Sequence, residues 1–424
     1  MRIYLDSIGC RLNQSEIEMF ARQFHSAGHT LVATPQEADL AIVNTCSVTA
    51  KAESDSRQKI RRLINAGAND VIVTGCWATL EPEKVAALPG VSRVITNPFK
   101  DDLPILAFSE DGHLENDKRT FAGGVPGPRH RTRTFLKVQD GCNNHCTYCV
   151  TVLARGRARS RRLENVISDI QSAYLSGTQE VILSGVHLGS WGEDLEGKSN
   201  LRELIEAILI QTDIPRVRLS SLEPWDLDEH FFDLWRDPRL CRHLHLPLQS
   251  GCNATLTRMA RHTTQQAYYS IVASLRKVIP DVALTTDIIA GFPGETDEEF
   301  SESMAFVRKL DFAGGHVFTY SERPGTVAAM LPDQIPMPVR KKRNAEMRVV
   351  FSETSLRYRQ HFIGKKLEVL WESAVKNPDG SFLLSGLTDN YLRVRSNNER
   401  DLWNRISWVH MLALLREDMI GVIE

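Results

Sequence analysis

The stretch Cys142-Asn-Asn-His-Cys146-Thr-Tyr-Cys149 places three cysteines in one short segment, with three residues between the first pair and two between the second. Thiolates are soft ligands that select iron–sulfur clusters, zinc or copper. Ferredoxin sequences supply four cysteines at other spacings, and structural zinc sites usually contain paired Cys-x2-Cys knuckles. Because three thiolates on a cubane cluster leave one iron free, the segment predicts an open iron–sulfur cluster. A closed zinc site with a distant fourth ligand is the alternative.

The composition around this segment is that of a soluble globular protein. The chain has 424 residues, of which 42% are hydrophobic and 25% charged, and this length allows two or three domains. The net charge is −2, so any nucleic-acid contact must come from local basic patches. Residues 1–10 lack the pattern of a signal peptide, and no apolar run has the length of a membrane span. We therefore expect a cytoplasmic protein whose eight cysteines stay reduced and available to metals.

The first hundred residues alternate short β-rich runs with helical patterns, which predicts a doubly wound parallel sheet. The β-rich runs are Arg2–Ile8, Leu40–Val43 and Val71–Val73. Cys10, Cys46 and Cys76 each follow the end of one of these runs. Ligands bind at that edge of open parallel sheets, so three strand ends bring three thiolates to one rim. A single buried cysteine would mean little, but this repetition predicts a second metal site.

Residues 101–133 have no apolar period and predict a linker. It ends in Arg129-His-Arg-Thr-Arg133, which is either a solvated connector or an arm that contacts phosphate. Strand–helix alternation then resumes, and six units predict a partial (β/α)6 barrel instead of a closed eightfold one. The six strand-like runs are Thr134–Val138, Glu180–Leu183, Arg216–Leu219, His243–Leu246, Val282–Ile289 and Gly315–Phe318. The segment at Cys142 follows the first of them, on the face where barrel active sites lie.

Polar and glycine-containing segments follow the other strands of this barrel on the same face. Glycine allows close approach of the backbone to a ligand, and polar neighbours offer hydrogen bonds. Taken singly, each segment is more often only a strand–helix turn, but their alignment at one rim favours a cofactor site. The residues assigned to it are Tyr148, Ser184, Gly185, Ser221, Glu223, Gln249, Arg261, Asp287, Gly291, Pro293 and Gly294.

The last part of the chain changes character. A basic run, Arg340-Lys-Lys-Arg343, lies on a predicted helix, and it is either a solvated face or an RNA contact. Five short strands with a turn at Asn377-Pro-Asp-Gly380 predict a small antiparallel β-barrel, an architecture often used to bind RNA. Arg393 and Arg395 offer charge, and Tyr391 and Trp371 offer stacking surfaces. A place in the barrel core is the alternative for the two aromatic side chains.

Together these motifs resemble the methylthiotransferases, radical S-adenosylmethionine (SAM) enzymes with a second cluster in an N-terminal domain and a C-terminal TRAM domain. The resemblance covers nearly the whole chain. The N-terminal and central matches are Gly9-Cys10-Arg-Leu-Asn13-Gln14-Ser-Glu16, Val43-Asn-Thr-Cys46, Thr74-Gly-Cys76, Gln139-Asp-Gly-Cys142 and Ala154-Arg-Gly156. The later matches are Leu246-Pro-Leu-Gln-Ser-Gly251, Gly291-Phe-Pro-Gly-Glu-Thr296 and Tyr320-Ser-Glu-Arg-Pro-Gly-Thr326. Asn13-Gln14 and Glu322-Arg-Pro-Gly325 resemble the branch that acts on threonylcarbamoyl-adenosine in tRNA, the base next to the anticodon.

The resemblance implies three domains: residues 1–120 with an auxiliary cluster and linker, a radical SAM core over residues 121–359, and a TRAM RNA-binding domain over residues 360–424. Cys142, Cys146 and Cys149 would hold the [4Fe–4S] cluster that cleaves SAM, and the cofactor-site residues would hold SAM itself. Cys10, Cys46 and Cys76 would hold a second [4Fe–4S] cluster that carries the sulfur. All six cysteines are thus the expected catalytic and metal residues.

The implied reaction uses two molecules of SAM. One methylates the sulfur, and the other yields a deoxyadenosyl radical that takes a hydrogen atom from carbon 2 of the base. A radical is needed because no side chain is basic enough to deprotonate an inert C–H bond at pH 7. The implied partners are the tRNA anticodon stem-loop, an electron donor such as flavodoxin or ferredoxin, and a sulfur source, with no membrane. Arg155, Arg157, Arg159, Arg161 and Arg162 would meet RNA phosphates, unless they form a solvated helix start.

Two alternatives to this function remain. One is a methylthiotransferase for isopentenyladenosine or for a ribosomal protein, and the other is a non-enzymatic iron–sulfur RNA-binding sensor. The sequence also departs from the family pattern after two cysteines. It reads Val150-Thr-Val-Leu153 where an Ile-Pro-Tyr run is common, and Trp77-Ala-Thr79 where a Tyr-Ala-Gln run is common. Both departures are expected to change the shape of the substrate pocket and to leave the six ligands intact.

Overall fold

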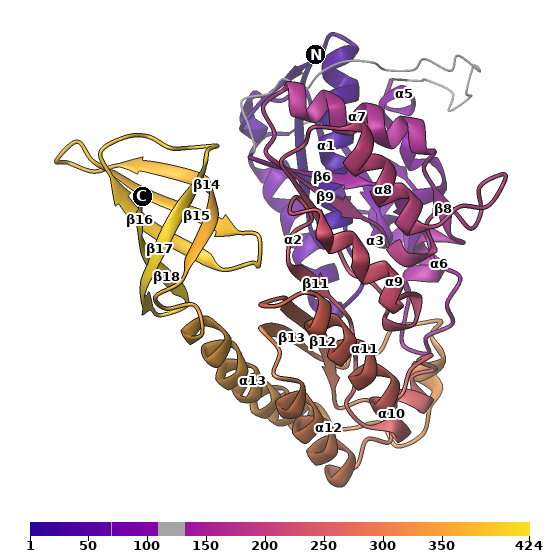
Figure 1. Cartoon of the computed structure of the whole chain (residues 1–424). Helices are drawn as coiled ribbons and strands as arrows, with labels where there is room; N and C mark the ends of the chain where they lie inside the picture. Colours follow the sequence, from indigo (N-terminus) through magenta and orange to yellow (C-terminus); the bar gives the residue numbers. More distant parts are fainter. Residues whose placement is uncertain (69, 109–131) are drawn as a thin grey trace.

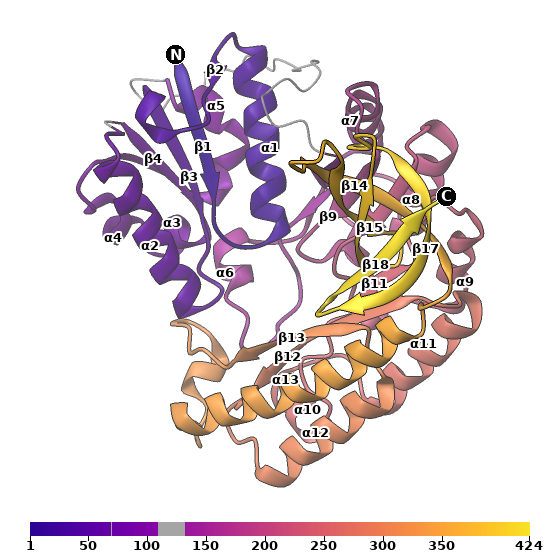
Figure 2. The ribbon, with the colours of Figure 1, turned by 90° about the vertical axis from the view of Figure 1, so that its left-hand side faces the viewer.

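The computed structural model describes residues 1–68, 70–108 and 132–424, and it begins with a five-stranded parallel sheet (Figures 1 and 2). The strand order is β2-β1-β3-β4-β5. The strands are β1 (Arg2–Ser7), β2 (Thr30–Leu31), β3 (Leu40–Thr45), β4 (Val71–Gly75) and β5 (Val91–Ile95). The helices are α1 (Arg11–Ser26), α2 (Ala50–Asn65), α3 (Cys76–Leu80) and α4 (Pro82–Ala86).

Both faces of this sheet are apolar, because helices cover both. On β3, Leu40 and Ile42 pack in one core with Phe20 and Phe24 of α1. The alternate residues Ala41 and Val43 pack in a second core with Ile60 and Leu63 of α2. Successive side chains of a strand point to opposite faces, so this division confirms the predicted doubly wound sheet.

The predicted linker begins later than expected. A short helical turn, Asn97–Asp102, runs into α5 (Leu103–Leu106), and Leu103 is fully buried in the α1-side core. The prediction of a linker is therefore wrong for residues 101–106. Two buried apolar residues one turn apart are too few to indicate a helix from the sequence. The basic arm at residues 129–131 and the predicted boundary at residue 120 lie outside the described residues.

The central region is the predicted partial barrel. Its six parallel strands form two three-stranded sheets in the orders β10-β9-β6 and β11-β12-β13. Single β-bridges from Val217 to Leu240 and from Ser221 to His245 join them. The strands are β6 (Arg133–Lys137), β9 (Glu180–Ser184), β10 (Arg216–Leu219), β11 (His243–His245), β12 (Ala283–Ala290) and β13 (Gly314–Thr319). All six strands predicted from the sequence are therefore present.

Helices cover the outside of this barrel. They are α7 (Leu163–Leu175), α8 (Leu201–Gln211), α9 (Glu229–Phe232), α10 (Asn253–Arg258), α11 (Gln265–Val278) and α12 (Asp297–Leu310). Helix α12 starts at a capping box between Thr296 and Glu299, as its acidic first turn predicts. A two-stranded ribbon of β7 (Gln139–Asp140) and β8 (Arg159–Ser160), with α6 (Thr151–Arg155), frames the first cysteine segment.

The basic run lies on the long helix α13 (Met337–Gln360), which connects the barrel to the C-terminal domain (Figure 2). Arg340 and Arg343 are buried, and Arg343 forms a 2.8 Å ion pair with Glu295. Lys341 and Lys342 are exposed. Half of the run therefore anchors α13 to the core, so only the two lysines remain available to RNA.

The C-terminal domain is a closed five-stranded barrel in the order β14-β15-β16-β18-β17, and it stands to one side of the rest of the molecule in Figure 1. The strands are β14 (Lys366–Lys376), β15 (Phe382–Thr388), β16 (Arg393–Asn398), β17 (Ile406–Leu415) and β18 (Asp418–Ile423). The barrel is mixed and not fully antiparallel as predicted, because β16 pairs with β18 in parallel. An odd number of strands cannot alternate in direction around a closed ring, so one parallel pair is required.

The C-terminal barrel docks on the central barrel through buried arginines. Arg218 on β10 donates to the carbonyl oxygens of Thr388 (3.1 Å) and Asp389 (2.8 Å), and it also pairs with Glu180 (2.7 Å). The ring of Tyr391 stacks on His243 with centroids 4.2 Å apart, and its hydroxyl accepts a hydrogen bond from Arg11. Tyr391 therefore joins all three parts of the protein. No helix in the described part of the chain is long and apolar enough to span a bilayer.

Candidate active site

The structure places Cys10, Cys46 and Cys76 at one edge of the N-terminal sheet. They follow β1, β3 and β4, which are neighbours in the sheet, with Ser7 aligned to Asn44 and Thr45 aligned to Gly75. Parallel strands end at the same edge, so the register alone brings the three residues together. The geometric part of the prediction is thus confirmed, whereas binding of a metal remains a prediction.

The local packing around this edge is tight. Gly9 has φ +112°, and a Cβ atom there would lie 2.9 Å from the Sγ atom of Cys46. Only glycine avoids this contact and adopts this conformation readily. Burial raises the pKa of the Cys46 thiol to about 12, so without a metal the thiol keeps its proton. Metal binding would have to displace that proton.

The second set of cysteines lies in the loop between β7 and α6. The Cys149 amide donates to the Cys146 carbonyl (3.0 Å), and the Cys142 amide donates to the Gly156 carbonyl (3.1 Å), which closes the loop. All three cysteines are partly exposed. In both sets, no three His, Cys, Asp or Glu side chains of the described residues surround a single metal position. A cubane cluster does not need this, because each thiolate binds a different iron.

Arg261 and Glu223, two of the predicted cofactor residues, form an ion pair beside this loop. Their closest atoms, Nη2 and Oε2, are 2.6 Å apart, and Nη1 of Arg261 lies 3.8 Å from the Sγ atom of Cys146. The guanidinium also lies over the ring of Trp225 at 4.5 Å. A cation held in this way offsets negative charge on a thiolate.

A small cleft with a cavity volume of about 180 Å³ opens beside the cysteine loop. Cys149 lines one side, and Val48 and Thr49, which closely follow Cys46, line the other. Three predicted cofactor residues, Tyr148, Gln249 and Asp287, are also in its wall. The remaining lining residues are Val150, Thr151, Ile289, Phe318, Thr319, Tyr320 and Ser321. Cys149 and the segment that follows Cys46 therefore line one cavity.

The other predicted cofactor residues lie outside the wall of this cleft. Ser184 is buried at the end of β9, and Gly185 packs against Gln139. Gly291 packs against the side chain of Arg340, and Gly294 against Arg258. These positions give the glycines a packing role, and their contact with a cofactor stays a prediction. The assignment of Ser221 and Pro293 to the cofactor site also stays a prediction, because neither residue lines the cleft.

Several RNA and pocket assignments are wrong because the side chains are buried. Arg155 is 4% exposed and pairs with Glu16, so it cannot meet RNA phosphate. Trp371 is fully buried in the C-terminal barrel, which confirms the core alternative for this residue, and Tyr391 is half-buried and held between domains. Trp77 is 1% exposed in the sheet core, so this departure from the family pattern does not line the cleft. Thr151, in the other departure, does line it.

Contacts that no sequence motif indicated hold the N-terminal sheet over the cleft. Arg323 donates to the Ser47 hydroxyl (2.7 Å) and pairs with Glu53 (2.9 Å). The Ala50 amide donates to the hydroxyl of Ser321 (3.2 Å). Arg323 was noted only as part of a motif, and no local pattern could show that its partners lie about 270 residues earlier.

Two family models match the chain. The model described as "Uncharacterized protein family UPF0004" matches residues 2–96, and the "Radical SAM superfamily" model matches residues 136–307. The first covers Cys10, Cys46 and Cys76, and the second covers the cysteine loop and most of the central barrel.

Similar curated proteins cover nearly the full length. The chain is 34% identical to the threonylcarbamoyladenosine tRNA methylthiotransferase MtaB of Bacillus subtilis, over 96% of this chain and 92% of that protein. It is 35% identical to the protein of the same name from Thermotoga maritima, over 99% and 96%. It is also 34% identical to the tRNA-2-methylthio-N(6)-dimethylallyladenosine synthase of Caldicellulosiruptor saccharolyticus, over 91% and 84%.

Among solved structures, the radical S-adenosylmethionine methyltransferase TsrM from Kitasatospora setae resembles this chain with a TM-score of 0.58. The two are 16% identical, and the match covers 77% of each chain. At this identity the likeness concerns the fold alone, and it agrees with the N-terminal sheet and partial barrel described above.

Proposed function

The chain belongs to the radical SAM tRNA methylthiotransferases, and within this family we propose that it modifies threonylcarbamoyladenosine next to the anticodon, adding a methylthio group at carbon 2. As a member it is an enzyme that uses SAM and a [4Fe–4S] cluster. When bound, these supply a carbon-centred radical that can take hydrogen from an unactivated C–H bond. This membership sets aside the non-enzymatic sensor and the ribosomal-protein alternative.

The residues proposed for each group follow from the two cysteine sets. Cys142, Cys146 and Cys149 hold the SAM-cleaving cluster, and Cys10, Cys46 and Cys76 hold a second [4Fe–4S] cluster. The observation that carries this proposal is the cleft, because Cys149 and the segment after Cys46 line the same cavity. A substrate base in this cavity would be within reach of both sites, as an insertion of sulfur after hydrogen removal requires.

Within the cleft, this chain's own side chains would position the reactants. Tyr148 and Phe318 offer apolar ring surfaces, while Gln249 and Asp287 offer hydrogen-bonding groups. Gln249 has φ +71°, a strained conformation for a non-glycine residue that is often retained at ligand sites. Arg261, tied to Glu223, would place positive charge beside the Cys146 thiolate.

The choice of threonylcarbamoyladenosine over dimethylallyladenosine rests on sequence motifs. Identity does not separate the two, because relatives with both names are about 34% identical to this chain. The motifs Asn13-Gln14 and Glu322-Arg323-Pro324-Gly325 favour the first. In the structure, both motifs contact segments at the N-terminal cysteines. Arg323 binds Ser47, and Asn13 lies 3.7 Å from Cys10.

The remaining partners are also proposals. The tRNA anticodon stem-loop would contact the exposed arginines Arg393 and Arg395 of the C-terminal barrel and Arg157, Arg159 and Arg162 near the cleft. Flavodoxin or ferredoxin would supply electrons, and a separate source would supply sulfur, in the cytoplasm. We retain domains over residues 1–120, 121–359 and 360–424; the last boundary falls at the end of α13.

Mass spectrometry of tRNA nucleosides tests the substrate. Cells lacking the gene should lose 2-methylthio-threonylcarbamoyladenosine and retain 2-methylthio-dimethylallyladenosine, and the wild-type gene should restore the lost nucleoside. A copy with Cys142, Cys146 and Cys149 replaced by Ala serves as the matched control and should not restore it. Loss of the dimethylallyl nucleoside instead would assign the chain to the other branch.

A further inference from the structure

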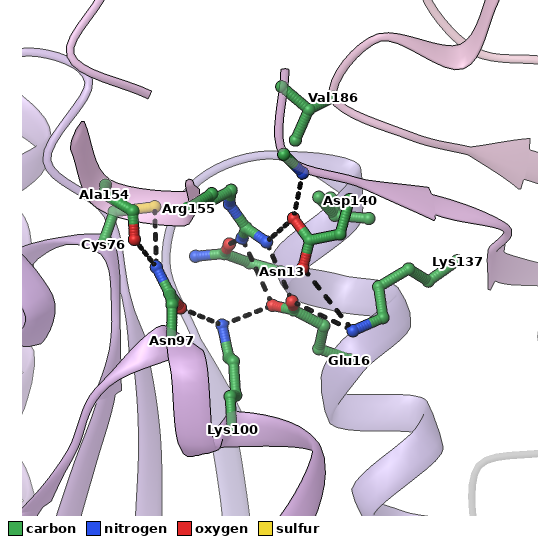
Figure 3. A network of polar contacts seen from close by, with 12 residues as sticks. Asn13, Glu16, Cys76, Asn97, Lys100, Lys137, Asp140, Ala154, Arg155 and Val186 are labelled. Carbon is green, nitrogen blue, oxygen red and sulfur yellow. Dashed lines mark hydrogen bonds and ion pairs between the residues drawn. The ribbon is translucent and has the colours of Figure 1, made fainter. Parts of the chain in front are cut away.

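A network of buried charged side chains surrounds Glu16, close to Cys76 (Figure 3). Every member is at most 7% exposed, although charged residues are rarely buried in proteins. The members are Glu16, Lys100, Lys137, Asp140 and Arg155. We call them the Glu16 network. They come from the N-terminal sheet domain and from both flanks of the cysteine loop, so the network crosses the domain interface.

Glu16 on α1 is the centre of this network and is fully buried. Its carboxylate pairs with Arg155 (Nη1 to Oε1, 2.9 Å) and with Lys100 (Nζ to Oε2, 2.5 Å). It also accepts a hydrogen bond from the side chain of Asn44 (2.9 Å) and lies 3.8 Å from the Lys137 ammonium. One carboxylate thus holds two domains together through several charged contacts.

The network touches the auxiliary cysteines through two asparagines. Asn13 accepts a hydrogen bond from Arg155 (2.7 Å), and its Oδ1 atom lies 3.7 Å from the Sγ atom of Cys10. Asn97 accepts one from Lys100 (3.2 Å), and its Nδ2 atom lies 3.9 Å from the Sγ atom of Cys76. Each of these two cations is therefore one side chain away from a cysteine.

The same network holds the ends of the second cysteine loop. Asp140 lies two residues before Cys142, pairs with Arg155 (2.9 Å) and accepts a hydrogen bond from the Gly141 amide (2.8 Å). Arg155 is the last residue of α6, which follows the loop. The loop thus ends on Arg155, which is bound to the N-terminal domain through Glu16, and begins on Asp140, which is bound to Arg155, so the position of the loop depends on contacts with the N-terminal domain.

The charges of the network do not balance. Three cations, Lys100, Lys137 and Arg155, face two buried carboxylates, Glu16 and Asp140. A third carboxylate, Asp101, pairs with Lys137 at 2.6 Å, but its side chain is 66% exposed. Asp101 therefore compensates Lys137 from the surface, and the excess of one cation exists only among the buried groups. A buried ion network rarely adds stability over apolar packing, so this excess points to another role. The thiolates of Cys10, Cys46 and Cys76 would supply the missing negative charge.

We propose that the Glu16 network is a positioning device for the auxiliary cluster, in which Lys100 and Arg155 stabilise its negative charge and raise its reduction potential. This rests on the proposed function, which assigns a cluster to Cys10, Cys46 and Cys76. Reduction adds one electron to the cluster and makes the site more negative. A buried cation stabilises this added charge strongly, because the surrounding medium screens it little.

Redox titration of the full-length protein, reconstituted with both clusters and followed by electron paramagnetic resonance, tests this proposal. Addition of SAM identifies the signal of the cluster that binds it, and the SAM-insensitive signal is the one measured. Lys100→Met removes the cation and should lower the ratio of reduced to oxidised cluster at least tenfold at a fixed potential, about 59 mV for one electron. Glu16→Gln removes the anion and should shift the ratio in the opposite direction.

Lys137→Met is the matched control. It also removes one buried cation from Glu16, but Lys137 has an exposed partner in Asp101, and its ion-pair partners are carboxylates and not an asparagine beside a cysteine. Its shift should be clearly smaller than that of Lys100→Met, whereas a purely structural network predicts similar losses of thermal stability and no shift in either variant.

The outcomes separate this proposal from the proposed function. If the wild-type protein binds only four irons, the assignment of a second cluster fails, and with it the proposed function. If two clusters form but neither variant shifts the potential, or Lys100→Met and Glu16→Gln shift it in the same direction, only the present proposal fails. Loss of the SAM-insensitive signal in both variants would also overturn it, because the network would then serve assembly alone.

Discussion

The two cysteine sites are built in opposite ways. Cys142, Cys146 and Cys149 lie in one loop, whose flanks are joined by the β7–β8 pairing and by a backbone hydrogen bond from Cys142 to Gly156. Cys10, Cys46 and Cys76 come from three strand ends and meet only when the parallel sheet is formed. The first site depends on local spacing, and the second on the register of a whole domain. The two should therefore respond differently to the loss of ligands and of distant packing.

Removal of each ligand set should have the largest effect. A Cys142→Ala, Cys146→Ala, Cys149→Ala variant should keep one of two clusters, about four of about eight irons, and form no deoxyadenosine. A Cys10→Ala, Cys46→Ala, Cys76→Ala variant should also keep one cluster and still form deoxyadenosine with reductant, because each domain has its own core. It should yield no methylthiolated nucleoside. Iron analysis and chromatography of the products provide the measurement.

The opposite pattern would reverse the assignment. Deoxyadenosine from the first variant, or methylthiolated nucleoside from the second, would show that the two sites have been exchanged. Because the Glu16 network joins the two sites, the second variant also tests whether the N-terminal sheet folds when its three cysteines are replaced. Its thermal melting should remain cooperative if the sheet forms without the metal.

The loop site should also be independent of the docking of the C-terminal barrel. Arg218→Met leaves the fully buried Glu180 with only the more distant Arg133 (3.8 Å) as a cationic partner and removes hydrogen bonds to the carbonyls of Thr388 and Asp389. Breaking such a buried pair costs about 3–5 kcal/mol, so the melting temperature should fall while the iron content and SAM cleavage are unchanged.

Arg395→Ala is the control for this variant. Arg395 pairs with Asp418 at 2.6 Å, but its side chain is 47% exposed, and such pairs contribute about 0–1 kcal/mol. Melting followed by circular dichroism should separate the two variants clearly. Loss of a whole cluster in Arg218→Met would show that the terminal barrel supports the cysteine loop, and would remove the contrast between the sites.

The contrast also explains what could be predicted from the sequence. Strand ends and the spacing of cysteines are local patterns, so the positions of Cys10, Cys46 and Cys76 at one sheet edge followed from three short β-rich runs. Burial is not local. Arg155 belongs to a run of arginines that indicates an RNA contact. Its partner Glu16 lies 139 residues earlier, so no local pattern shows that Arg155 is buried.

The C-terminal barrel shows the same limit. Five short strands were visible from alternation and turn residues, but the direction of β18 depends on closure of the ring. Tyr391 and Trp371 are aromatic residues, the type expected to stack on bases. The structure places Tyr391 against His243 and Trp371 in the core, because the cavities they fill are formed by strands distant in the sequence.

The smallest effect is expected for the two cysteines outside both sites. Cys241 is 1% exposed at the start of the central barrel strands, with its Sγ atom 3.8 Å from the Glu180 carboxylate. Cys252 is 2% exposed and precedes α10. Cys241→Ala and Cys252→Ala remove one buried sulfur atom each, which typically costs about 1 kcal/mol. Both should bind as much iron as the wild type and melt slightly lower. Loss of about four irons in either variant would mean that this cysteine is a cluster ligand, and the division into a loop site and a strand-end site would need to be redrawn.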